Sequence, residues 1–138
     1  LLLSQIGHVR SEIAPVREGV KLYDAKGEVT DAQYHLLFPN MTININPGFP
    51  NLSIDTWRSD GPLRTLGMSE QYFAPGVDPG FARDLVEFNR QVGAEDDVLT
   101  SSVQRGLNAG IPEHGRFLTE AEKLVGEFQK LVATAVAS

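Results

Sequence analysis

Two hydrophobic periodicities divide the chain near its middle. Between Met41 and Asn46 apolar residues alternate with Thr and Asn, which is the pattern of a strand with one buried face. After Asp78-Pro79 the apolar residues recur at helical spacing instead: Phe81, Leu85, Phe88 and Val92. The pattern therefore predicts strands in the first half of the chain and helices in the second.

Turn residues separate the strands expected in the first half. Residues 1–20 have no clear pattern, and we expect a loosely ordered lead-in there. Two short strands are predicted within Val20–Thr30, around a turn at residues 24–27. Longer strands are predicted over Tyr34–Phe38, Met41–Asn46, Leu52–Arg58 and Leu63–Phe73. Short connections between them predict an antiparallel meander.

The second half predicts two helical segments. Asp78 can cap the first helix, Pro79 suits its first turn, and Gly93 leaves its continuity open. After a loop at residues 111–115, Thr119–Glu122 has the form of a capping box. An apolar stripe follows it: Ala121, Leu124, Val125, Phe128, Leu131 and Val132. Strands followed by helices predict an α+β fold, with helices packed on one face of an antiparallel sheet.

Composition narrows the classes of function. The 138 residues are the length of a single domain, and 12 Lys and Arg against 18 Asp and Glu give a net charge of -6. That charge argues against a general nucleic-acid or anionic-membrane partner. The chain has no cysteine, which excludes thiolate zinc sites, cysteine nucleophiles and any iron–sulfur cluster held by these residues.

Asp96 is the acidic residue that the apolar pattern singles out. On a helix that advances about 100° per residue, its acidic neighbours Glu95 and Asp97 lie to either side. Three apolar residues fall within about 60° of it: Leu99, Val103 and Leu107. Asp96 is therefore expected to point along the apolar stripe. A carboxylate there must be neutralised, hydrogen-bonded or bound to a cation.

Two interpretations of Asp96 stay open from its position. An Arg or a backbone donor could satisfy the carboxylate where the sheet and helix meet, or the carboxylate could serve as a metal ligand or catalytic acid–base. Three adjacent acids also commonly form a solvated helix face. Position alone therefore does not decide between a structural and a chemical role.

No other residue lies at a recognisable metal-ligand or catalytic spacing that would make it a partner of Asp96. His8, His35 and His114 are not at metal-ligand spacing; we expect a lead-in residue, a strand residue and an exposed loop residue, respectively. Nucleophile-elbow and phosphate-loop motifs are absent, and Ser101 and Ser102 lack a visible base. Aromatic residues of the predicted strands are expected in the core or a pocket wall: Trp57, Tyr72 and Phe73.

The residues around Asp96 resemble a known signature. Asp96 follows an acid, and Gln104-Arg105-Gly106 comes next, with the Gln eight positions after the Asp. This pattern resembles the carboxyl-terminal part of the catalytic domain in α subunits of Rieske non-haem iron oxygenases, the ring-hydroxylating type. Supporting similarities extend the resemblance from about Val20 to the end: Leu37–Asn40, Met41–Asn46, Glu70–Phe73 and Phe117–Glu122.

The resemblance implies a fold, a metal and partners. The fold would be a helix-grip, a curved antiparallel sheet around a long helix. A mononuclear Fe(II) would be held by two histidines and one carboxylate, here Asp96. A Rieske 2Fe–2S centre would deliver electrons from NAD(P)H through a reductase or ferredoxin. O2 and a small organic, typically aromatic, substrate would give hydroxylated or demethylated products, in a cytoplasmic homo-oligomer for which the family suggests a trimer.

Two parts of the family pattern are missing from these residues. There is no Rieske Cys/His motif and no Glu-x-Tyr-His-x4-His segment, which supplies both iron histidines in the family. We therefore expect residues 1–138 to be one domain, the carboxyl-terminal portion of an oxygenase catalytic domain. With one of three protein ligands, this piece alone is expected to bind Fe(II) weakly and to be inactive.

Two other classes of function compete with the oxygenase. A helix-grip module without iron would hold an apolar ligand between sheet and helix, with Asp96 paired to a basic residue. A plain structural domain would also need a partner for Asp96, because an unpaired buried charge is costly. Upstream sequence separates the first two, since the oxygenase requires a Rieske motif and a two-histidine helix there. Candidate cavity walls are Phe88, Val92 and Leu99.

Overall fold

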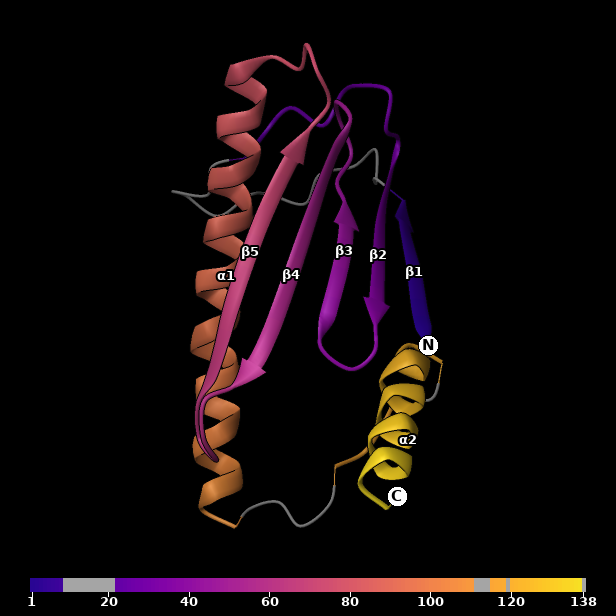
Figure 1. Cartoon of the computed structure of the whole chain (residues 1–138), viewed down its shortest axis with the longest axis vertical. Helices are drawn as coiled ribbons and strands as arrows, with labels where there is room; N and C mark the ends of the chain where they lie inside the picture. Colours follow the sequence, from indigo (N-terminus) through magenta and orange to yellow (C-terminus); the bar gives the residue numbers. More distant parts are fainter. Residues whose placement is uncertain (9–21, 111–114, 119, 138) are drawn as a thin grey trace. The chain divides into compact units, whose positions relative to one another are not determined.

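The structure is a computed structural model that describes residues 1–8, 22–110, 115–118 and 120–137 (Figure 1). It divides into two compact units, residues 1–86 and residues 87–138. The first unit holds the sheet and the start of the long helix. The second holds the rest of that helix and a shorter one. No helix among the described residues is long and apolar enough to span a membrane.

The first unit is built on a five-stranded antiparallel sheet whose strands lie side by side in chain order (Figure 1). Its strands are β1 (Leu2–His8), β2 (Asp31–Leu37), β3 (Met41–Ile45), β4 (Asn51–Ser59) and β5 (Thr65–Phe73). The meander predicted from short connections is confirmed, and so is the α+β class, because two helices follow the sheet.

Two predictions about the amino-terminal part were wrong. The described part of the lead-in is a strand, because seven register pairs join β1 to β2 although its local pattern is weak. Residues 22–30 form no strand; Val29 makes only an isolated bridge to Gly48. A Cβ at Gly27 would overlap the Gly48 carbonyl group, so this glycine permits close backbone approach and does not turn a hairpin.

The register sorts the strand residues onto two faces. Thr42 lies opposite Asp55, Asn44 opposite Ser53, and Trp57 opposite Gly67. Because paired residues share a face and neighbours alternate, these side chains lie on one face, here called the polar face. The opposite face, here called the apolar face, carries the predicted alternating residues Met41, Ile43 and Ile45. It also carries Ile54, which pairs with Ile43, and Leu52, two residues before Ile54 on β4.

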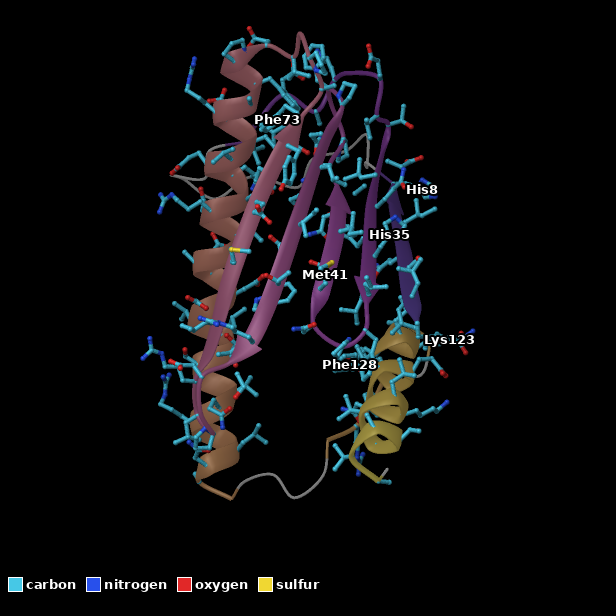
Figure 2. All side chains as sticks on the ribbon, viewed as in Figure 1. His8, His35, Met41, Phe73, Lys123 and Phe128 are labelled. Atoms are coloured by element: carbon cyan, nitrogen blue, oxygen red, sulfur yellow. The ribbon has the colours of Figure 1, made fainter. Side chains whose placement is uncertain are left out.

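Phe81, in the first turn of the long helix, is the centre of the described core. Its ring meets three others edge-on, with centroids 5.8 Å from Tyr23, 5.1 Å from Phe49 and 6.5 Å from Phe73. Gly48, at φ 121°, lies under the same ring. Figure 2 labels Phe73 near the end of β5, just before the chain enters the helix. These aromatic contacts fix the first turn of the helix onto the end of the sheet.

The two helices begin close to the predicted positions. Helix α1 (Pro79–Asn108) starts where Asp78 Oδ2 accepts the backbone N–H of Phe81 at 2.9 Å, and it continues through Gly93 without a break. Gly110, at φ 76°, follows its end. Helix α2 (Lys123–Ala137) is preceded by a bond of 2.7 Å from the Leu118 N–H to the Glu122 carboxylate. The predicted cap Thr119 and the loop at 111–114 lie outside the described residues.

Candidate functional site

Asp96 lies in the second half of α1 with an exposed side chain. Its backbone carbonyl accepts the Thr100 hydroxyl at 2.9 Å, but its carboxylate has no hydrogen-bond or ion-pair partner among the described residues. The preceding acid, Glu95, accepts a hydrogen bond of 3.2 Å from the Gln91 amide. The carboxylate of Asp96 is therefore chemically available to a ligand.

The continuity of α1 brings the two halves of the apolar stripe onto one helix. Leu85, at the sheet end, is completely buried. Around Asp96 the stripe is exposed within the described residues: Val92 at 40%, Leu99 at 63%, Val103 at 62% and Leu107 at 56%. Such a carboxylate, flanked by apolar side chains, differs from a purely solvated helix face, whose surroundings would be polar.

The described residues do not complete a metal site by themselves. They contain no group of three or more His, Cys, Asp or Glu side chains able to hold a metal ion. Asp96 offers one carboxylate, a donor type that Fe(II) accepts together with imidazole. The donor chemistry fits an iron ligand, whereas the number of donors requires further ligands from elsewhere.

The two described histidines belong to the sheet. His35 Nδ1 lies 2.9 Å from Ser4 Oγ, and His8 Nδ1 lies 2.8 Å from Asp31 Oδ1 (Figure 2). Both contacts follow from the register, which pairs β1 with β2 at these positions. The prediction of His35 as a strand residue is confirmed, and His8 is a strand residue too. His114 lies outside the described residues.

A cluster of hydrogen-bonded side chains on the polar face was not anticipated from the sequence. Asn44 Nδ2 donates to Asp55 Oδ2 at 2.7 Å, and Thr42 Oγ1 donates to the same oxygen at 3.2 Å. Asn44 Nδ2 is also 3.3 Å from the Oγ of Ser53, which is 5% exposed. The available signal was the alternation of polar residues in two neighbouring strands, but only the register brings them together.

The aromatic residues of β4 and β5 have three different surroundings. Phe73 lies in the Phe81 cluster, as predicted for a core residue. Trp57 packs on Gly67, where a Cβ would lie 3.2 Å from the indole, and borders a cavity of about 560 Å³ with Met68. Tyr72 was expected inside but is 48% exposed; its hydroxyl donates to Glu70 at 3.1 Å, which raises the pKa of Tyr72.

Comparison with protein families gave one match that covers most of the chain. A family model described as the ring hydroxylating alpha subunit (catalytic domain) matches residues 10–138. Searches of curated proteins and of solved structures found no match. The family match includes α1 with Asp96, and it includes β2–β5 with the polar face.

Proposed function

This chain belongs to the ring-hydroxylating α-subunit family, and from that premise we propose that it forms part of the terminal component of an oxygenase. That component would insert oxygen from O2 into a small organic, most often aromatic, substrate. The match of residues 10–138 to the catalytic-domain model is the observation that carries this proposal. We take residues 1–138 as the carboxyl-terminal portion of that catalytic domain.

In this proposal Asp96 is the carboxylate ligand of a mononuclear Fe(II). The spacing of Asp96 to Gln104-Arg105-Gly106 supports this assignment, and so does its carboxylate without a partner among the described residues. Two histidines from a segment upstream of these residues would complete the set. When bound, the iron would supply the activation of O2.

The residues around Asp96 would control access to that site. The exposed apolar side chains of Val92 and Leu99 flank it on α1 and suit an apolar ring better than water. Phe88 lies one turn before Val92 on the same helix and is a further candidate for the cavity wall.

We propose that other parts of the assembly deliver the electrons. The chain has no cysteine, so a Rieske 2Fe–2S centre, with its two Cys and two His ligands, would require residues beyond these 138. A reductase or ferredoxin would pass it electrons from NAD(P)H. We propose a homo-oligomer, with a trimer as the form that the family suggests.

Replacement of Asp96 by Ala in the full subunit tests the proposal. Product formation from O2 and an aromatic substrate is expected to fall by at least about a hundredfold, since one of three iron ligands is lost. The visible absorbance of the Rieske centre should persist. Asp97→Ala is the matched control: it removes the adjacent exposed carboxylate and should keep most activity. Full turnover by Asp96→Ala would refute the assignment.

A non-enzymatic module that binds an apolar ligand is the second candidate. The exposed apolar side chains of Leu99, Val103 and Leu107 on α1 favour it. This module would bind hydrophobic molecules without iron, and Asp96→Ala would leave that binding unchanged. Iron analysis of the full subunit separates the two candidates.

A further inference from the structure

The carboxylate of Asp55 has one engaged oxygen and one free oxygen. Asn44 and Thr42 both donate to Oδ2, at 2.7 and 3.2 Å. Oδ1 has no hydrogen-bond or ion-pair partner among the described residues, and the side chain is half-buried. Two donors on one oxygen hold the carboxylate in a single orientation and leave the other oxygen as a fixed acceptor.

An aromatic surface lies beside that acceptor on the same face. Trp57 is two residues along β4 from Asp55, so both side chains leave the sheet on the polar face. Its ring rests on Gly67, and the residue as a whole is 41% exposed. The indole N–H has no hydrogen-bond partner among the described residues. A flat, fixed and partly open ring next to a carboxylate is suited to an organic cation.

The local charges favour a positive ligand. Arg58, the next residue of β4, alternates to the opposite face, where it pairs with Leu66. No Lys or Arg among the described residues neutralises Asp55. The chain carries a net charge of -6, which adds a weak long-range attraction for cations. A neutral ring would gain from Trp57 alone, whereas an ammonium group would gain from both residues.

We propose that Asp55 and Trp57 form a subsite for a protonated amino group on a small organic molecule. The ammonium donates to Asp55 Oδ1 and lies against the Trp57 ring, while Asn44 and Thr42 act as positioning residues. This inference rests on the proposed function only for the fate of the bound molecule, which would be an amine-bearing substrate of the oxygenase.

Calorimetry on the iron-loaded full subunit tests the subsite with two matched probes, benzylamine in its protonated form and neutral benzyl alcohol. Asp55→Asn is nearly isosteric: its remaining oxygen can accept from Asn44 and Thr42, and an amide N–H₂ replaces the free acceptor. This change is expected to weaken benzylamine binding by at least about tenfold and benzyl alcohol binding by less than about threefold.

Two further variants keep the test decisive. Asp60→Asn removes the same charge from an exposed turn, where Asp60 pairs with Arg64 at 3.1 Å, and should alter neither affinity. Trp57→Leu should weaken both probes, because the ring surface is lost. An unchanged ratio of amine to alcohol affinity in Asp55→Asn would overturn the subsite, as would an equal amine loss in Asp60→Asn.

Turnover assays separate this inference from the proposed function. Amine binding that depends on Asp55, in a subunit that forms no oxygenated product, supports the subsite and contradicts the oxygenase. Oxygenation of neutral aromatic compounds by a subunit that does not bind benzylamine overturns the subsite and leaves the oxygenase intact.

Discussion

Asp96 and Asp55 differ in how far the sequence could reveal them. Asp96 stands out locally, because helical spacing and the Gln104-Arg105-Gly106 pattern both lie within a few turns of it. The hydrogen-bonding environment of Asp55 is formed by Asn44 and Thr42, which lie on another strand. A shift of the register by one residue would send those side chains to the opposite face. Its surroundings could therefore be read only from the pairing of β3 with β4.

The Tyr23 hydroxyl is expected to make the free energy of unfolding depend on pH in the alkaline range. Burial, and secondarily the nearby Tyr34, raises the pKa of Tyr23 to about 12. The unfolded chain ionises this group near pH 10, so it releases a proton before the folded chain does. The free energy of unfolding should therefore fall as pH rises from about 10 to 12, by roughly 1 kcal/mol once solvent screening of the half-buried ring is allowed for.

Urea unfolding of the wild type and of Tyr23→Phe measures this effect. The difference in unfolding free energy between the two proteins should be constant below about pH 9 and should shift against the wild type above about pH 10. Other groups titrate in both proteins and cancel in that difference. A difference that stays constant up to pH 12 would show that Tyr23 does not carry the pH dependence.

At the scale of elements, strong hydrophobic periodicity correctly predicted the type and the approximate position of most strands and helices. β3, β4, β5 and both helices fall within a few residues of their predicted bounds, since alternation and apolar stripes are local signals. β1 escaped prediction because an edge strand with a mixed pattern depends on its pairing with β2. The two short strands predicted around residues 22–30 were wrong because Gly27 has the local character of a turn residue. In the structure this glycine permits close contact with Gly48.

The attachment of α1 to the sheet yields a stability prediction at Gly48. A Cβ there would lie 2.6 Å from the Phe81 ring, and the backbone has φ 121°, which L side chains rarely adopt. Gly48→Ala should therefore lower the free energy of unfolding by about 2 kcal/mol or more.

Gly93→Ala is the matched control for Gly48. It adds the same methyl group within α1, where nothing lies within 4 Å, and should stabilise the protein by about 0.5–1 kcal/mol. Urea unfolding compares both variants with the wild type. Equal effects of the two substitutions would contradict the packing of Phe81 on Gly48.

At the scale of the whole molecule, membership of one family agrees with both the predicted fold class and the resemblance around Asp96. Composition excluded cysteine chemistry and argued against nucleic-acid partners, and the strand-then-helix order predicted the α+β class. The family match over residues 10–138 agrees with the resemblance first seen around Asp96. A complete metal site could not be read from the sequence or from the described residues, because neither supplies three suitable ligands together.

Mononuclear iron per full subunit is the measurement that tests the account most directly. Total iron, less the iron assigned to the Rieske centre from its absorbance, should be about one per subunit in the wild type and in Asp97→Ala. In Asp96→Ala it should fall below about a tenth of that value. Equal mononuclear iron in Asp96→Ala and the wild type would contradict the central claim, that Asp96 holds the iron of an oxygenase.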